Sequence, residues 1–322
     1  MPLISFVVPV LNEEANIERL YDTVTQVMKT VESQYQYEIL FTDNHSEDDT
    51  FRIASDLSRS DGRVRVLRFS RNFGFQASIL TGYLNSRGDA VVQLDCDLQD
   101  PPFLVLEFLK YWEQGYKVVY GIREKRQEGM AITLARKTFY RFLRFLSDYP
   151  IPVDAGDFRL VDRRIIEEIR QINDATPYLR GMIACLGFEQ IGIPYARDAR
   201  VAGSSKFKLL DLLKLAVDGI LNHSVVPLRL GTICSQLIFI CAILVLLGYC
   251  VARLTVGRSW PAGFTTLSVL VLLSTGLNAL LLGIQGEYIG RIFKQVKQFP
   301  ATVIEHRQEH PEADLSLNSK AS

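Results

Sequence analysis

The stretch Asp95-Cys96-Asp97-Leu98-Gln99-Asp100 has the spacing that points most directly to chemistry. It follows the apolar run Val91-Val92-Gln93-Leu94, which is typical of a buried strand, so its polar side chains would stand where that strand ends. Alternate carboxylates in such a position can present oxygen atoms to one hard cation. Mg²⁺ or Mn²⁺ favours these ligands and keeps water and substrate phosphates as its others. Surface pairs of aspartates are common, but the place of Asp95 and Asp97 after the strand favours a metal site.

A second polar stretch runs from Thr42 to Thr50 and also follows an apolar segment. Asp43 can accept hydrogen bonds from a nucleoside base or a ribose. Local turn chemistry gives a different interpretation, in which Ser46 or Asp48 caps a helix and further acids occupy its first turn. The two interpretations are compatible, and the residues leave both open.

The stretch 154–160 places a carboxylate, Asp157, beside a glycine in a loop that follows a helical segment. A carboxylate in such a loop is a candidate general base, or a group that orients an acceptor. Asp157 can equally form an ion pair with Arg159 or with another arginine. The sequence does not decide between these roles.

Several cations could serve a phosphate acceptor or a pyrophosphate leaving group, because both need charged hydrogen-bond donors. Most surface arginines and lysines are merely solvated, so each is weak evidence alone. The basic, Gly/Ser-containing loop 200–207 is a better candidate because it adjoins an amphipathic segment, where a lipid phosphate would sit. The candidates are Arg123, Arg136, Lys137, Arg197, Arg200 and Lys206.

Alternating strand and helix patterns must position these side chains. The sequence predicts that the polar clusters 12–14, 43–49 and 95–100 all follow strands of one parallel sheet with helices on both faces. Ligands bind such sheets at the carboxyl ends of the strands. The predicted strands are 3–10, 37–42, 64–69, 90–94, 118–121 and 187–195, and the predicted helices are 14–33, 48–58, 75–85, 103–114, 130–147 and a segment that ends near 171.

Two runs without a charged residue, 230–252 and 259–286, predict a transmembrane hairpin. Each exceeds the roughly 20 apolar residues that cross a bilayer. Only Arg253 and Arg258 lie in the connector, whereas basic residues flank both outer ends, so the positive-inside rule predicts cytoplasmic termini at the inner membrane. Small residues at 276–279 would allow close helix packing and leave a homo-oligomer open.

These patterns divide the chain into a catalytic domain (1–205), interfacial helices (206–229, with an amphipathic stretch at 209–221), two transmembrane helices (230–286) and a cytoplasmic tail (287–322). The tail is polar after Pro300 and is predicted to be disordered.

Composition excludes several other classes. Lys+Arg and Asp+Glu both number 36, so no basic excess indicates a nucleic-acid partner. The five cysteines show no zinc or disulfide pattern. The first residues reach Asn12 too soon, and without a basic flank, for a signal peptide. A G-x-G-x-x-G dinucleotide motif and a phosphate-binding P-loop are both absent from the sequence.

Taken together, the motifs resemble inverting family 2 glycosyltransferases of GT-A fold, and within them the polyprenyl-phosphate branch. The resemblance covers roughly residues 3–295. Such enzymes usually have Asp-Asp-Gly-Ser where this chain has Asp43-Asn44-His45-Ser46, so the implied role passes to Asp43 and not to position 44. The motifs are Val7-Val8-Pro9-Val10-Leu11-Asn12-Glu13, Asp43 with Ser46, Gly74 with Gln76-Ala77, Asp95-x-Asp97-x-Gln99-Asp100-Pro101-Pro102, Gly156-Asp157-Phe158-Arg159 and Arg200-x-x-Gly203-x-Ser205-Lys206.

The resemblance implies transfer of a sugar from a nucleotide-sugar, UDP-glucose first, to a polyprenyl phosphate such as undecaprenyl phosphate at the bilayer. It implies a nucleotide-sugar site at Pro9, Asn12, Glu13, Asp43, Ser46, Gln76 and Asp95. It implies Mg²⁺ or Mn²⁺ on Asp95, Asp97 and Gln99, and catalytic roles for Asp157, Arg123 and Arg200. It implies a lipid-phosphate site at Arg136, Arg200, Ser205 and Lys206.

Alternatives of other kinds remain. The donor could be another nucleotide-sugar, such as GDP-mannose, as in dolichol-phosphate mannosyltransferases. A processive polysaccharide synthase would need more membrane spans and a Gln-x-x-Arg-Trp motif, which neither Trp112 nor Trp260 provides. A membrane scaffold without catalysis would not need the set formed by Asp95, Asp97 and Gln99.

Overall fold

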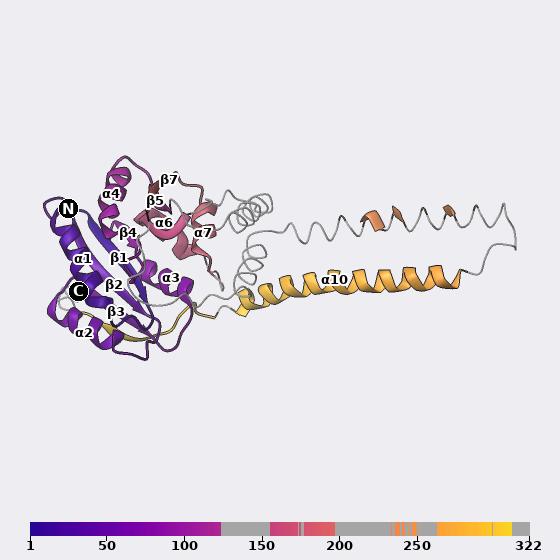
Figure 1. The fold of residues 1–322 in the computed structure, drawn as a ribbon, viewed down its shortest axis with the longest axis horizontal. Helices are drawn as coiled ribbons and strands as arrows, with labels where there is room; N and C mark the ends of the chain where they lie inside the picture. Colours follow the sequence, from indigo (N-terminus) through magenta and orange to yellow (C-terminus); the bar gives the residue numbers. More distant parts are fainter. Residues whose placement is uncertain are drawn as a thin grey trace, which may run out of the picture. The chain divides into compact units, whose positions relative to one another are not determined.

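A computed structural model of the chain describes residues 1–123, 155–172, 174, 177–196, 263–297 and 299–310, with scattered residues between 233 and 251. The chain divides into two compact units. The first holds an eight-stranded sheet with its flanking helices, and the second holds the long helix α10 (Phe264–Lys297) (Figure 1).

The sheet has the strand order β7-β5-β6-β4-β1-β2-β3-β8. Its centre is parallel, because β1 pairs in parallel with β2 and β4, and β2 with β3. β6 runs antiparallel to both β4 and β5, and β8 runs antiparallel to β3. The strands are β1 (Leu3–Val10), β2 (Gln36–Asp43), β3 (Val64–Phe69), β4 (Ala90–Gln93), β5 (Val118–Arg123), β6 (Ala155–Asp162), β7 (Gln190–Tyr195) and β8 (Ile304–Gln308).

Helices cover both faces of the sheet, as the sequence predicted. One apolar cluster joins β1 side chains such as Phe6 to α1, α2 and α4, and a second joins Val7 to α3, α6 and α7. Neighbouring residues of β1 point to opposite faces, and both faces are covered by helices. The strand is therefore apolar almost throughout. The helices are α1 (Ile17–Lys29), α2 (Thr50–Ser60), α3 (Phe75–Asn85), the 3₁₀ turn η1 (Pro102–Leu104), α4 (Val105–Glu113), α6 (Arg163–Gln171) and α7 (Leu179–Cys185).

Helix α3 lies unusually close to the central strand. A Cβ atom added at Gly82 would lie only 2.2 Å from Cγ1 of Val7. Any larger side chain at this position would push α3 away from β1, so the glycine permits the close approach. This packing sets the position of the loop 70–74, which leads into α3 and borders the carboxyl edge of the sheet.

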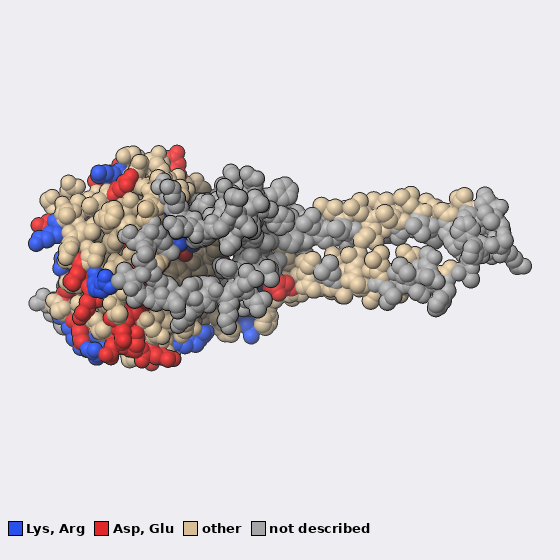
Figure 2. All heavy atoms as spheres, in the orientation of Figure 1, with Lys and Arg blue, Asp and Glu red and all other residues tan. Residues whose placement is uncertain are grey.

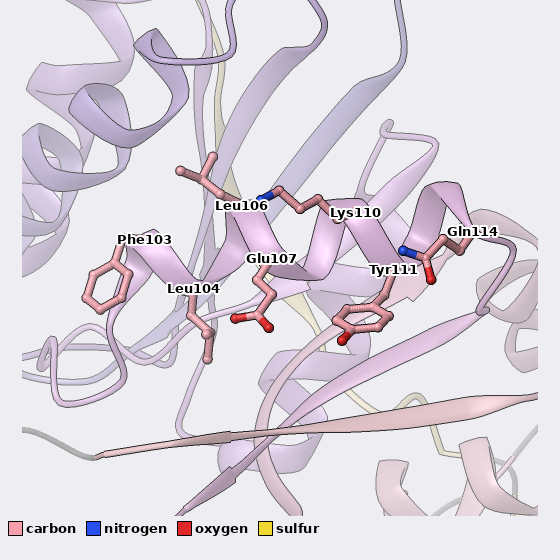
Figure 3. Close-up of a pocket in the computed structure, with 7 residues that line it drawn as sticks. All are labelled: Phe103, Leu104, Leu106, Glu107, Lys110, Tyr111 and Gln114. Carbon is pink, nitrogen blue, oxygen red and sulfur yellow. The ribbon is translucent and has the colours of Figure 1, made fainter.

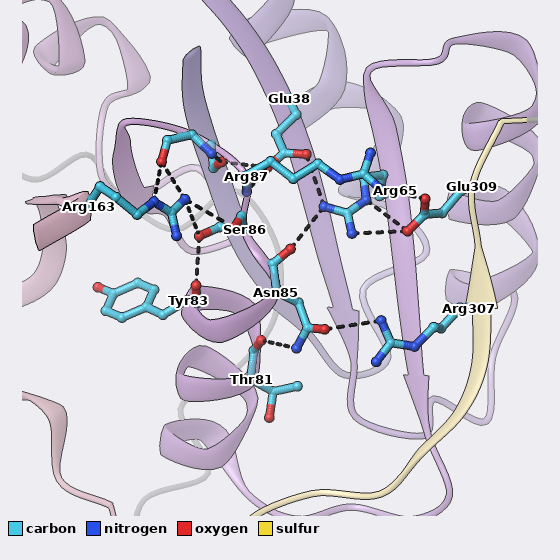
Figure 4. A network of polar contacts seen from close by, with 12 residues as sticks. Glu38, Arg65, Thr81, Tyr83, Asn85, Ser86, Arg87, Arg163, Arg307 and Glu309 are labelled. Atoms are coloured by element: carbon cyan, nitrogen blue, oxygen red, sulfur yellow. Dashed lines mark hydrogen bonds and ion pairs between the residues drawn. The ribbon is translucent and has the colours of Figure 1, made fainter. Parts of the chain in front are cut away.

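The prediction of a disordered tail after Pro300 was wrong for the residues that form β8. The tail returns to the sheet and pairs with β3, and Arg65 of β3 explains why. Its side chain is only 6% exposed, and its buried charge is compensated by ion pairs to Glu38 (3.1 Å) and Glu309 (3.0 Å). Figure 4 shows this network, in which Arg307 of β8 also donates to Asn85 of α3.

The second unit is described by its helix α10, which contains 34 residues. Large apolar side chains along it are exposed, among them Leu267, Leu273 and Leu282, and Figure 2 shows much of its surface without charged side chains. In the part of the chain that the structure describes, no helix combines the length and apolar character needed to cross a membrane. The predicted helix 130–147, the interfacial segment 206–229 and most of the run 230–252 lie outside the described residues.

Candidate active site

The carboxyl edge of the central strands gathers strained backbone. In the described part of the chain, three residues other than glycine have positive φ: Asn12 (56°), His45 (66°) and Leu98 (53°). They follow β1, β2 and β4, which are neighbours in the sheet. Left-handed backbone is uncommon for such residues, and strain of this kind clusters at functional sites. The edge is therefore the candidate site, where the sequence placed it.

The loops that follow β1 and β2 are joined by hydrogen bonds. The backbone N–H of Asn12 donates to Oγ of Ser46 at 3.0 Å, and the N–H of Glu47 donates to Oδ1 of Asn12 at 2.9 Å. The N–H of Glu13 donates to Oγ1 of Thr50 at 2.8 Å. Pro9 lies within β1, in register with Thr42 of β2. Asn12, Glu13 and Ser46 thus build one rigid wall of the site, beside the carboxyl end of β2.

Asp43 stands at the end of β2 and is fully buried. Its Oδ1 accepts the N–H of Ser46 at 3.0 Å, and its Oδ2 lies 3.3 Å from Nη1 of Arg68 without a hydrogen bond. Arg68 also donates to the carbonyl of Ser46 and lies over the ring of Phe51. Asp43 therefore stabilises the turn after β2. A buried carboxylate oxygen with unused accepting capacity also suits a ligand's hydroxyl or N–H.

Capping of α2 differs in detail from the sequence prediction. Asp48 accepts the N–H of Thr50 at 3.0 Å, so it serves the first turn. Ser46 accepts the N–H of Asn12 instead and does not cap the helix. Asn44, one of the two departures from the family pattern, accepts the N–H of Phe73 at 2.8 Å and so fixes the loop before α3.

The acidic stretch after β4 places Asp95, Asp97 and Gln99 at the same edge. Asp95 accepts Nε2 of Gln93 at 3.0 Å, and Asp97 accepts the N–H of Gln99 at 3.1 Å. Burial raises the pKa of Asp95 to about 7, with the charges of Asp100, Asp157 and Asp97 acting in the same direction. Negative charge is therefore crowded around Asp95.

These residues fit a hard divalent cation. The described residues contain no group of three or more His, Cys, Asp or Glu side chains arranged as a metal site. Two carboxylates and an amide oxygen nevertheless suffice for Mg²⁺ or Mn²⁺, which takes its remaining ligands from water and phosphates. A cation would also offset the burial and the neighbouring negative charges that together raise the pKa of Asp95.

Arg123 is tied to the far end of the acidic stretch. Its Nη2 lies 3.2 Å from Oδ2 of the fully buried Asp100, and its Nε donates to the hydroxyl of Tyr195 at 3.2 Å. Tyr195 in turn donates to Oδ1 of Asp100. β5 and β7 thereby hold a guanidinium beside the acids, where it could balance charge on a leaving group. The catalytic role of Arg123 stays a prediction.

Asp157, in β6, forms a two-pronged ion pair with Arg180 of α7. Nε and Nη2 of Arg180 donate to Oδ1 and Oδ2 of Asp157, both at 2.8 Å, while Arg159 is 3.7 Å away. Burial alone would raise the pKa of Asp157, but Arg180, with Arg159 and Arg123 behind it, holds that pKa below its ordinary value. The sequence left open whether Asp157 pairs with Arg159 or with another arginine, and the structure shows Arg180 as its partner.

The remaining predicted residues divide into two groups. Gln76 accepts the N–H of Leu179 at 3.2 Å, so its side chain connects α3 to α7. Lys137, Arg197, Arg136, Arg200, Ser205 and Lys206 lie outside the described residues, so their roles stay predictions. Sequence reasoning missed Arg68, Arg180 and Tyr195, because folding brings them to the site from segments without a recognisable motif.

A separate surface depression lies along η1 and α4 (Figure 3). It has a volume of about 340 Å³ and is lined by Phe103, Leu104, Leu106, Glu107, Lys110, Tyr111 and Gln114. None of these residues belongs to the acidic edge. The edge remains the candidate site because it has the crowded carboxylates, the buried ion pairs and the strained backbone.

A mostly parallel sheet with these acids at its carboxyl edge defines a GT-A-like glycosyltransferase domain. Residues 5–170 match the family described as Glycosyl transferase family 2. An uncharacterized glycosyltransferase of Bacillus subtilis is 39% identical over 302 residues, which are 94% of this chain and 93% of that protein. The chain belongs to glycosyl transferase family 2 and is a glycosyltransferase.

Other similar proteins include the SfII prophage-derived bactoprenol glucosyl transferase of Shigella flexneri. It is 34% identical over 303 residues, covering 94% of this chain and 97% of its own length. Among solved structures, a mannosyl-3-phosphoglycerate synthase from Rubrobacter xylanophilus has a TM-score of 0.47 at 19% identity, over 68% of this chain and 72% of that one.

Proposed function

We propose that this enzyme transfers glucose from UDP-glucose to a polyprenyl phosphate, with inversion, to give a β-linked lipid-phosphate sugar. The observation that carries the proposal is nearly full-length similarity to bactoprenol glucosyl transferases, which extends beyond the family domain and includes both apolar runs. The acidic edge supplies the donor chemistry that such a reaction needs.

The donor would lie across the carboxyl ends of β1, β2 and β4. Asp43, held by Ser46 and Arg68, would accept hydrogen bonds from the nucleoside. Asp95 and Asp97, with Gln99, would hold Mg²⁺ or Mn²⁺, which stabilises charge on the departing diphosphate when bound. Gln76, Asn12 and Glu13 would shape the pocket from the neighbouring loops.

The acceptor chemistry does not require a strong base. A lipid phosphate is already largely ionised near neutral pH, so its oxygen can attack the anomeric carbon directly. Asp157 carries a lowered pKa because Arg180, Arg159 and Arg123 outweigh its burial. A carboxylate that is ionised throughout the working pH range would orient the acceptor or take a residual proton. Arg123, and Arg136 and Arg200 as the family implies, would balance the phosphate charge.

The enzyme would work at the cytoplasmic face of the inner membrane, with the runs 230–252 and 259–286 as a hairpin and the segment 206–229 at the interface. Both runs are uncharged and longer than the roughly 20 residues needed to span a bilayer. Pairing of β8 with β3 supports a hairpin, because a chain that leaves and rejoins the same sheet would cross a membrane an even number of times.

A panel of radiolabelled nucleotide-sugars, offered with undecaprenyl phosphate and Mn²⁺, tests the proposal. We expect a lipid product with UDP-glucose and little or none with GDP-mannose or UDP-galactose. A product with GDP-mannose instead would move the enzyme to the mannosyl branch. A folded protein that turns over no donor at all would favour the scaffold alternative.

A further inference from the structure

The short helix α7 holds two residues of the candidate site at once. The backbone N–H of Leu179 donates to Oε1 of Gln76 at 3.2 Å. The next residue, Arg180, donates two hydrogen bonds to the carboxylate of Asp157. Gln76 belongs to the predicted donor side of the site, and Asp157 to the predicted acceptor side. One turn of helix therefore connects two groups that lie far apart in the sequence.

Arg180 is the principal partner of Asp157 among the described cations. It donates to each carboxylate oxygen at 2.8 Å, whereas Nη2 of Arg159 lies 3.7 Å away and donates to the carbonyl of Gly156 at 2.8 Å. Arg123 is bound to Asp100 and Tyr195. The side chains of Arg180 and Asp157 are 28% and 18% exposed, so their contact is largely shielded from water.

Two parallel hydrogen bonds fix both the position and the rotation of a carboxylate, which a single bond or a lysine ammonium does not. Asp157 also lies near other acidic side chains, because its charge, like those of Asp97 and Asp100, helps to raise the pKa of the buried Asp95. Without the guanidinium of Arg180, the carboxylate of Asp157 would be repelled by these acids and free to rotate.

We infer that Arg180 is a positioning residue of the transfer reaction, which holds the carboxylate of Asp157 in the orientation that the acceptor phosphate requires. The inference rests on the proposed function, since it assigns Arg180 a task only if Asp157 contributes to turnover. In this role Arg180 acts through Asp157 and not through direct contact with the reacting atoms. Replacing Arg180 should therefore have no effect on kcat once the carboxylate of Asp157 has been removed.

A double-mutant cycle of Arg180→Met and Asp157→Asn tests this dependence, with transfer measured at saturating UDP-glucose and polyprenyl phosphate. Arg180→Met should lower kcat by about 10-fold or more while the KM for UDP-glucose changes less than about 2-fold. Arg180→Lys should recover part of the loss, because it returns the charge without the fork. In the Asp157→Asn background, Arg180→Met should cause no further loss.

Arg164→Met is the matched control, because Arg164 is an exposed arginine of α6 whose side chain stacks on Phe188 and not on the site. It should leave kcat unchanged. Calorimetric binding of UDP with Mn²⁺ and a thermal melt, run on each variant, separate a local effect from unfolding. Should Arg180→Met melt early, Arg180→Gln and Arg180→Lys carry the same comparison.

The possible failures are distinct. Losses that add fully in the double variant would overturn the inference and make Arg180 an independent contact, for instance to substrate phosphate. A rise in KM with unchanged kcat would overturn it as well. Full turnover by Asp157→Asn would remove the role of Asp157 and the inference with it. Absence of transfer by the unaltered enzyme, with UDP binding intact, would instead contradict the proposed acceptor or donor.

Discussion

Arg65 and Glu309 form an ion pair that joins β3 to the end of the chain across 244 residues of sequence. Nε and Nη2 of Arg65 donate to Oε1 of Glu309 at 3.1 and 3.0 Å, while Nη2 of Arg87 donates to its other oxygen at 2.7 Å. The segment after α10 is therefore a structural part of the catalytic unit.

Glu309→Ala should destabilise the catalytic unit by about 1–3 kcal/mol, because Arg65 is buried and would keep Glu38 as its one ionic partner among the described residues. Chemical denaturation followed by circular dichroism measures the change. Glu305→Ala is the matched control on β8, where the half-exposed carboxylate lies 3.9 Å from His45 and 4.0 Å from His306, and it should stay within about 0.5 kcal/mol. Equal losses in both variants would contradict a special role for Glu309.

The contribution of Glu309 should depend on pH in a defined direction. Burial alone would raise the pKa of Glu309, but Arg65 and Arg87 hold it below its ordinary value. A carboxyl group whose pKa is lowered by folding stabilises the native state above its unfolded pKa, and this contribution is lost as pH falls through the folded pKa. The stability difference between the unaltered enzyme and Glu309→Gln should be constant near pH 7 and shrink below about pH 4. A difference that grows on acidification would reverse the assigned charge state.

Metal dependence follows from the acids after β4. Asp97→Ala removes one of two alternate carboxylates and should lower turnover by roughly 100-fold or more. EDTA should abolish transfer, and Mn²⁺ or Mg²⁺ should restore it. Asp56→Ala, on the exposed face of α2, is a control that should leave turnover unchanged. Undiminished activity in EDTA would remove the metal from the mechanism.

Membrane topology can be tested at both ends of the apolar runs. A reporter fused after Ser322 should lie in the cytoplasm, because β8 returns to the sheet that contains the N-terminal strands. A tag inserted near Gly257 should be accessible from the opposite side. Finding both labels on one side would exclude the hairpin, although the pairing of β8 with β3 would still hold.

The central sheet could be predicted because its strands carry their own signal. β1 is buried on both faces, so Val7 and Phe6 reach different cores and the run stays apolar without alternation. Polar residues then had to begin where the strands end. The sequence pattern therefore predicts Asp43, Asp95 and Asp97 at one edge of the sheet, independently of the strand order.

Strand β8 and the role of α7 depend on tertiary contacts that no local sequence pattern predicts. β8 has the charged sequence Ile-Glu-His-Arg-Gln and becomes a strand because β3 offers an open edge and Arg65 needs Glu309. α7 is too short to give a clear helical period, yet its Arg180 provides the partner of Asp157. Both cases show tertiary contacts deciding where local propensity is weak.

Nucleotide affinity should depend on the charge of Asp43. Asp43→Asn keeps the shape of the side chain but leaves Arg68 without its ionic partner and offers the nucleoside a weaker acceptor. We expect the Kd for UDP in the presence of Mn²⁺ to rise about 10-fold, which corresponds to about 1.4 kcal/mol. Calorimetry measures this directly, with Asp56→Asn as the exposed control of the same chemical change. Because Asp43 is fully buried, a thermal melt must accompany the titration. Unchanged affinity in a variant that melts normally would place the nucleoside contact elsewhere on the edge. Asp43 would then have only its role in the turn, because its hydrogen bond to the N–H of Ser46 is independent of any ligand.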